Sequence, residues 1–146
     1  MSRRGARAPQ FLAAETLVIQ IKTGDKSSSD PTVQSQVQRC LRLLKICRTR
    51  VDKSMLFSTN EEADDVKTAD LKFLLLPHYT AGLTILQSAP GGAEERLGFL
   101  TAAMKEWRFF VSQCEHYGLV RPEELAVFHR EVPAPQPPPP SPQRAH

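Results

Sequence analysis

The clearest helical pattern lies in residues 97–118. Apolar side chains recur there at alternating spacings of three and four, at Leu97, Leu100, Met104, Trp107, Val111 and Cys114. This spacing places them on one face of an α-helix. We expect the helix to end near Tyr117, because Gly118 can adopt the left-handed conformation that closes a helix and Leu119 can fold back on the last turn.

Residues 32–54 show the same period. Their apolar positions are Val33, Val37, Cys40, Leu44, Cys47 and Val51, and basic side chains fill many of the other positions. Asp30 can cap the free N–H groups at the start of this helix, and Pro31 suits the first helical position because no donor is needed there. The pattern lasts for about three heptads, which favours a packed bundle over a long two-chain coiled coil.

Two shorter segments, one near each end of the chain, also have the pattern of a helix. Residues 11–22 fit a helix, although the β-branched run TLVIQI is also typical of a strand; we favour a helix because the chain offers no partner strand. Residues 122–132 indicate a short final helix with Pro122 first and acidic side chains in the first turn. Its apolar side chains are expected to point inward, at Leu125, Phe128 and Val132.

Residues 56–83 contain signals for two more helix starts. Ser58 and Glu61 have the spacing of a capping box, and Thr68 with Asp70 can cap and charge the start of a second helix. The sequence therefore predicts an all-α protein of about five helices.

Pro77 lies about nine residues into that second helix. An interior proline removes one backbone hydrogen bond and costs roughly 3 kcal/mol. Burial of Leu74, Leu75 and Leu76, at about 1.5–3 kcal/mol each, outweighs this cost. We therefore expect a kinked core helix, with Gly82 on its inner face allowing another helix to approach closely.

The chain has 146 residues, of which 40% are hydrophobic, and this composition fits one globular domain. We expect a basic, disordered N-terminus at 1–10, a helical domain at 11–132 and a proline-rich, disordered tail at 133–146. No window is apolar for the roughly 18 residues of a membrane span, and Glu15 interrupts the first apolar run. These features predict a cytoplasmic protein that does not bind membranes.

The cysteines agree with an intracellular compartment. Cys40 and Cys47 would be about 10.5 Å apart along a helix axis, beyond the roughly 7 Å that a disulfide allows between Cα atoms. Reduced, buried thiols are therefore expected.

Charge is unevenly distributed although the formal net charge is only +3. Residues 39–53 carry six positive charges and one negative, whereas residues 60–67 carry four negative and one positive. The two segments either attract each other, form separate partner surfaces or are solvated helix faces. One functional alternative is a nucleic-acid-binding or scaffolding module, which would use Arg39, Arg42, Arg48, Arg50 and Lys53.

The sequence lacks the motifs of the common enzyme classes. It has no phosphate-binding glycine loop, no paired cysteine motif and no GxSxG elbow. Cys114 and His116 are two residues apart on a helix, so they point in different directions. His78 is expected to be a hydrogen-bonded core residue rather than a metal ligand. We therefore predict no catalytic residue, no metal and no cofactor.

The tail contains the pattern P-x-x-P-x-R, formed by Pro139, Pro142 and Arg144. Segments of this form dock on SH3-type domains as polyproline II helices, and a Ser-Pro pair at Ser141 can be a phosphorylation site. Such matches also arise easily in any proline-rich segment, so a polyproline-binding partner and a simple linker both stay open.

Residues 56–84, LFSTNEEADDVKTADLKFLLLPHYTAGLT, resemble the most characteristic stretch of the alpha-four family, also called immunoglobulin-binding protein 1. The likeness rests on Leu56-Phe57-Ser58, Asn60-Glu61, Asp70 to Leu75 and Pro77. It continues in weaker form through residues 97–125, which include the LVRPEEL segment, and back to about residue 10.

This resemblance implies an antiparallel helical array similar to tetratricopeptide and 14-3-3 proteins. It also implies a non-catalytic adaptor that binds the catalytic subunit of type 2A protein phosphatases and acts in TOR-type nutrient signalling. The candidate partner-binding residues that it carries over are Asn60, Glu61, Asp70, Lys72 and Pro77, whose role is either contact or structure.

The chain departs from the family after LVRPEEL. Relatives continue into further long helices with a basic motif of the form Lys-Ile-x-Arg-Phe/Tyr-Lys, whereas this chain reads AVFHREVPAPQPPPPSPQRAH. No residue here matches that motif, so a scaffold that has lost phosphatase binding is a further alternative. A shortened array would expose an apolar face, and we expect a marginal fold, self-association or coverage by residues 122–132.

Overall fold

The computed structural model describes residues 8–54 and 68–131, and all regular secondary structure in these ranges is helical. The elements are α1 (Ala8–Thr23), α2 (Pro31–Ser54), the 3-10 helix η2 (Thr68–Leu75), α3 (Leu76–Thr84), α4 (Ala93–His116) and α5 (Pro122–Glu131). The predicted all-α class is therefore confirmed, and the ambiguous segment at 11–22 is a helix.

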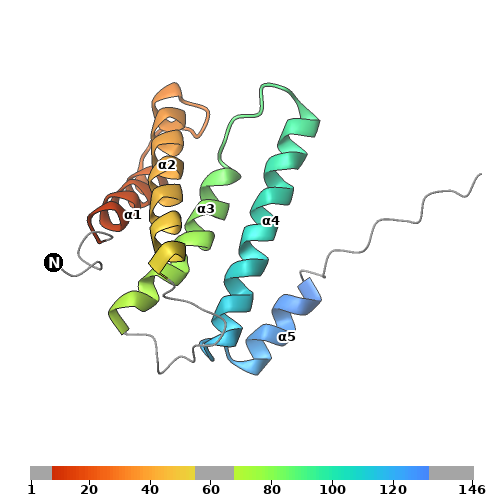
Figure 1. Cartoon of the computed structure of the whole chain (residues 1–146). Coiled ribbons are helices and arrows are strands. Elements are labelled where there is room, and N and C mark those ends of the chain that lie inside the picture. Colours follow the sequence, from red (N-terminus) through yellow and green to blue (C-terminus); the bar gives the residue numbers. More distant parts are fainter. Residues whose placement is uncertain (1–7, 55–67, 132–146) are drawn as a thin grey trace, which may run out of the picture.

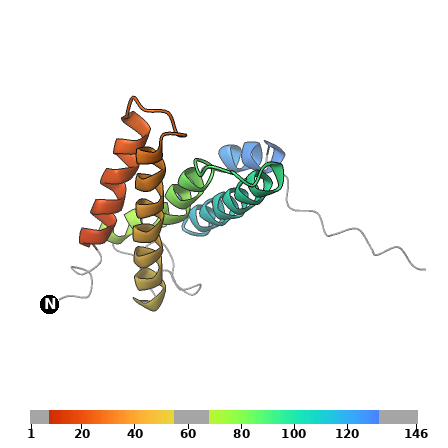
Figure 2. The same cartoon turned by 90° about the horizontal axis from the view of Figure 1, so that it is seen from above.

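The first four α-helices lie side by side in the order of the sequence. α1 packs against α2, α2 against α3 and α3 against α4 (Figure 1). Successive helices run in opposite directions, and the view from above shows α1 and α2 as a pair with α3 and α4 continuing from it (Figure 2). This arrangement is the antiparallel array that we expected.

The core is formed where α1, α2 and the η2–α3 segment meet. All six apolar positions that the sequence places on the inner face of α2 are buried. They pack with Phe11, Ala14 and Val18 of α1 and with Phe73, Leu76 and Leu83. The rings of Phe11 and Phe73 meet edge to face with centroids 5.1 Å apart, which joins α1 to η2.

Two of the helix ends that the sequence specified are confirmed by their hydrogen bonds. Oδ1 of Asp30 accepts a 2.8 Å hydrogen bond from the backbone N–H of Thr32, and this bond lowers the pKa of the Asp30 carboxyl. At the end of α4, Gly118 has a φ of 67°, and the N–H of Leu119 reaches the carbonyl of Cys114 at 2.8 Å. The second bond is the closing bond of a Schellman motif.

The expected kinked helix around Pro77 is wrong. The chain forms the 3-10 helix η2 up to Leu75, and Pro77 is the second residue of the separate helix α3. In the first turn of a helix the missing N–H of proline has no intrahelical acceptor to lose, so the roughly 3 kcal/mol penalty does not arise. Of the three leucines before it, Leu74 and Leu76 are buried and Leu75 is half-buried.

The role expected for Gly82 is also wrong. A Cβ atom built at this position would meet nothing within 4 Å outside the helix. No neighbouring helix therefore approaches closely enough to require glycine there.

The apolar stripe of α4 is only partly covered. Of the six positions named from the sequence, only Cys114 is buried, whereas Leu97 is 63% and Leu100 is 40% exposed. Among the described helices α4 has α3 on one side, and α5 lies beside its C-terminal end (Figure 1). α5 itself has no buried residue, and Leu125 and Phe128 are half-buried. Coverage by residues 122–132 therefore does not extend to the N-terminal half of α4.

Candidate partner-binding surfaces

The candidate contact residues of the shared segment divide by burial. Asp70 is 3% exposed and Pro77 is buried, whereas Lys72 lies on the surface. Asn60 and Glu61 lie outside the described residues, as do the predicted helix start at Ser58, the four-acid segment and the tail motif of Pro139, Pro142 and Arg144.

Lys72 is held in place by two aromatic rings. Its Nζ atom lies 5.4 Å from the ring centroid of Phe73 and 5.7 Å from that of Phe11, within the range of cation–π attraction. Because these rings belong to η2 and α1, the exposed ammonium group marks the place where both elements meet. Among the carried-over residues that are described, Lys72 is the one that a partner can reach.

His78 and Tyr79 connect α3 to two neighbouring helices, α4 and α1. The Tyr79 hydroxyl donates a 2.8 Å hydrogen bond to Oε2 of Glu15 on α1. Burial, together with this carboxylate, raises the pKa of Tyr79 to about 12. The His78 ring packs on Phe110 of α4 at 5.4 Å, and burial together with the charge of Lys22 lowers its pKa. His78 is thus a packing residue between α3 and α4, neutral near pH 7.

The three cysteines are packing residues in the interior, and their thiols are not activated for reaction. Cys40, Cys47 and Cys114 are free and buried, as expected. Burial raises the pKa of each thiol, that of Cys40 to about 11, so the thiolate form is scarce near neutral pH. His116 is exposed, and its ring contacts that of Tyr117 edge to face. The described residues contain no group of three potential metal ligands.

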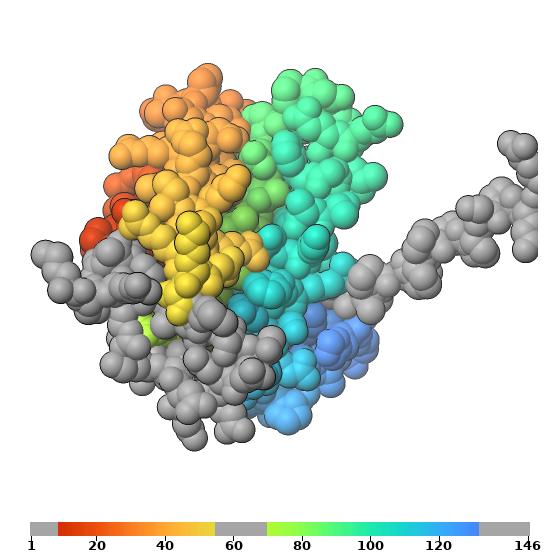
Figure 3. All heavy atoms as spheres, viewed as in Figure 1, coloured from red at the N-terminus to blue at the C-terminus, as the bar shows by residue number. Residues whose placement is uncertain are grey.

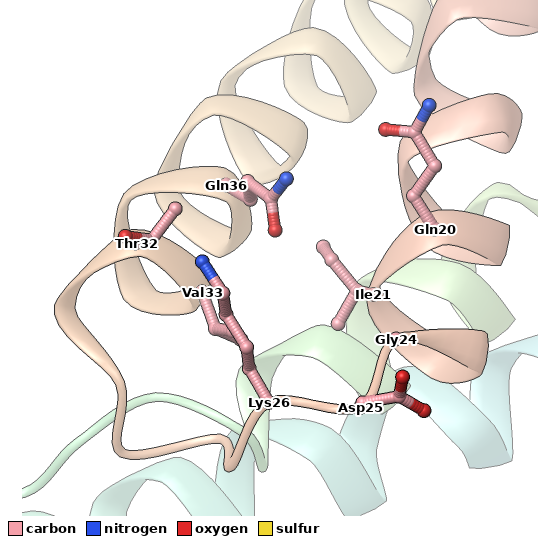
Figure 4. Close-up of a pocket in the computed structure, with 8 residues that line it drawn as sticks. All are labelled: Gln20, Ile21, Gly24, Asp25, Lys26, Thr32, Val33 and Gln36. Carbon is pink, nitrogen blue, oxygen red and sulfur yellow. The ribbon is translucent and has the colours of Figure 1, made fainter.

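A hollow of about 290 Å³ lies where α1 ends and α2 begins (Figure 4). It is lined by Gln20, Ile21, Gly24, Asp25, Lys26, Thr32, Val33 and Gln36. The amide groups of Gln20 and Gln36 come from facing helices, and Asp25 and Lys26 belong to the loop below them (Figure 4). The lining is polar on most sides, and its residues do not include a cysteine, a serine or a histidine that could form a nucleophile–base pair.

Two pairs of exposed apolar side chains lie on α1 and α4. Leu97 and Leu100 form a row on α4, and Leu12 and Ile19 form a row on α1 at 62% and 56% exposure. The period of the sequence identified the α4 stripe, but the part left open depends on which neighbours cover it.

No helix in the described ranges is long and apolar enough to span a membrane.

The fold and its surfaces define a helical array whose exposed rows and cationic side chains suit contact with another protein. Comparison with known sequences identifies the family within this class of protein. The pattern of the TAP42-like family matches residues 8–144, and the chain belongs to this family.

Named relatives agree with this placement. The chain is 35% identical over 107 residues to the PP2A regulatory subunit TAP46 of Oryza sativa subsp. japonica, covering 73% of this chain and 25% of that protein. It is 35% identical over 99 residues to the Arabidopsis thaliana protein of the same name, covering 66% and 23%. Immunoglobulin-binding protein 1 family member C of Homo sapiens is 28% identical over 112 residues, covering 76% and 32%.

The matches to the two plant proteins extend over about a quarter of their length. The name of those relatives describes a regulatory subunit of PP2A, which is a statement about the longer proteins. The resemblance stated from the sequence is confirmed, because the family model matches most of the chain and the human relative is named an immunoglobulin-binding protein 1 family member.

Proposed function

We propose that this chain is a non-catalytic adaptor that binds the catalytic subunit of a type 2A protein phosphatase and modulates its stability or activity. The observation that carries this proposal is the match of residues 8–144 to the TAP42-like family, whose plant relatives are named PP2A regulatory subunits. The proposal includes a cytoplasmic location and a role in TOR-type signalling, which the family resemblance implies.

The structure suggests which residues contact the phosphatase and which maintain the scaffold. Asp70 and Pro77 are buried, so we assign them to the η2–α3 junction rather than to a contact. The open row of Leu97 and Leu100 on α4 is our candidate contact, because exposed apolar rows at the edge of a helical array are typical of protein interfaces. Lys72 is the second candidate.

The test is a titration of isolated type 2A catalytic subunit against the full chain. A Leu97→Glu/Leu100→Glu variant removes the α4 row, and a Leu12→Glu/Ile19→Glu variant is the matched control, because the two rows are similarly exposed. Far-UV circular dichroism establishes that each variant is folded. We expect saturable binding by the parent and the control, and a loss of about tenfold or more in the α4 variant, as for the centre of an interface.

Two further variants separate the other candidates. Lys72→Glu reports on the second candidate contact, and a chain without residues 133–146 reports on the tail. The tail motif of Pro139, Pro142 and Arg144 is tested separately, by titration with an isolated SH3-type domain. Absence of phosphatase binding by the folded parent, beside a longer relative that binds, would overturn the adaptor proposal and favour a scaffold without this activity.

A further inference from the structure

The outer face of α2 carries a continuous row of exposed side chains. The row, called the basic stripe here, consists of Arg39, Arg42, Ile46, Thr49 and Lys53. Their spacings of three, four, three and four align them along one side of the helix, opposite the buried residues. The stripe spans about 21 Å at 1.5 Å per residue. Figure 3 shows α2 running along the surface of the molecule over most of its length.

The charged groups of the stripe are not used by the described part of the fold. Arg39, Arg42 and Lys53 form no hydrogen bond or ion pair within residues 8–54 and 68–131. Two other arginines of α2, which lie beside the stripe, do have partners. Arg48 forms an ion pair with Glu106 at 2.6 Å, and Arg50 donates a 2.6 Å hydrogen bond to Oε1 of Gln10. As far as the described ranges show, the stripe therefore holds three cations that are available to a partner.

The centre of the stripe is apolar rather than charged. Ile46 is 45% exposed between the cations. The hydroxyl of Thr49 donates a 3.0 Å hydrogen bond to the carbonyl of Lys45, so its donor is used inside the helix. The stripe thus has an apolar centre with positive charge on both sides, and no acidic residue is among its members.

We propose that the basic stripe of α2 is a docking surface for an acidic amphipathic helix of a partner protein. The partner helix supplies carboxylates opposite Arg39, Arg42 and Lys53, and an apolar side chain that covers Ile46. A row spaced by three and four matches the period of a second helix packed along α2, and interfacial charges then set its register.

Two other anionic partners fit the stripe less well. A nucleic-acid backbone offers evenly repeated phosphates and no apolar group for the exposed centre at Ile46. An anionic membrane surface would require a broad apolar face, and the stripe offers one large apolar side chain. The apolar centre between cations is the observation that favours a helical peptide. This docking surface is on α2 and does not depend on phosphatase binding by the row on α4.

The experiment uses the full chain and a designed helical peptide. The peptide has glutamates at both ends and a central leucine, all in one row at spacings of three and four, and a scrambled peptide of the same composition is the control. The variants are Arg42→Glu and Ile46→Ser, and Lys105→Glu is the matched control, because Lys105 is an exposed lysine on α4. Circular dichroism establishes that all three variants fold.

We expect the patterned peptide to bind in a salt-dependent way and the scrambled peptide to bind at least fivefold more weakly. Arg42→Glu should weaken binding about tenfold and Ile46→Ser about threefold, whereas Lys105→Glu should leave it unchanged. The proposal is overturned by equal binding of the two peptides, by no effect of Arg42→Glu, or by no peptide binding. Tighter binding to a DNA duplex or to phosphatidylserine vesicles than to the peptide would also overturn it, and would assign the stripe to that partner.

Discussion

Nη1 of Arg48 on α2 lies 2.6 Å from Oε2 of Glu106 on α4, and this ion pair links two helices that both pack on α3. The two side chains are 31% and 24% exposed, so the pair is only partly screened by water. Arg48 also lies over the ring of Phe109 at 5.3 Å. Arg48 therefore connects α2 to α4 through both a charged and an aromatic contact.

We expect Arg48→Ala and Glu106→Ala to destabilise the fold non-additively. A double-mutant cycle by urea unfolding should give a coupling free energy of about 0.5–1 kcal/mol at low salt, falling as salt is added. A coupling of zero at low ionic strength would show that the contact does not stabilise the fold.

Tyr79 should titrate far above an ordinary tyrosine. The chain has two tyrosines, so a Tyr117→Phe variant leaves Tyr79 as the sole signal in an ultraviolet titration. We expect a midpoint near pH 12, because burial and the Glu15 carboxylate both oppose ionisation. Glu15→Gln should lower the pKa, since it removes the negative charge and leaves burial as the main cause.

The raised pKa of Tyr79 determines whether the folded protein gains or loses stability as the pH rises. Because the folded pKa of Tyr79 is raised, its stabilising contribution is complete below the unfolded value of about 10 and is lost as pH rises through about 12. Tyr79→Phe should therefore be less stable than the parent near pH 8 and should lose less stability between pH 10 and 12. Parallel losses in both proteins over that window would contradict the raised pKa of Tyr79.

Local signals in the sequence were enough to place several features of this fold. Asp30 with Pro31 specified one helix start, and Gly118 with Leu119 specified one helix end, because caps depend on neighbouring residues alone. The period of α2 identified its buried face in full, since helices pack against that face on both sides.

Other features depend on contacts that no local pattern contains. The segment that changes from η2 to α3 between Leu75 and Leu76 has the same apolar period as one continuous helix, so spacing alone did not reveal the break. The burial of Asp70 and the exposure of Leu97 depend on which elements lie beside them. Residue types in the shared segment therefore identified a family but did not separate a buried residue such as Asp70 from an exposed one such as Lys72.

Two glycines provide a matched pair of opposite predictions. Gly118 has a φ of 67°, so Gly118→Ala should destabilise the protein by about 1 kcal/mol. Gly82 lies in α3 with open space around its Cβ position, so Gly82→Ala should stabilise it by about 0.5–1 kcal/mol. Urea unfolding of both variants measures the difference, and a destabilising Gly82→Ala would restore the idea of a close helix approach.

The three thiols should be protected while the protein is folded. Their raised pKa values and burial predict slow modification by a thiol reagent at pH 8, with all three reacting quickly after denaturation. Cys40 should be the slowest, because its Sγ also donates to the carbonyl of Ala14 at 3.3 Å. Fast labelling of one cysteine in the folded protein, followed by mass spectrometry, would identify an opening that the packed structure does not contain.

Pro77→Ala distinguishes a helix start from a kink. If Pro77 interrupted one long helix, alanine would restore a hydrogen bond and stabilise the fold by up to roughly 3 kcal/mol. Because Pro77 lies in the first turn of α3, we expect a loss of about 1 kcal/mol instead, from a freer unfolded chain and reduced burial. Thr80→Pro, three residues further into α3, is the control and should lose about 3 kcal/mol or more, since the interior of a helix does not tolerate proline. A gain in the unfolding free energy of Pro77→Ala would mean that η2 and α3 behave as one strained helix.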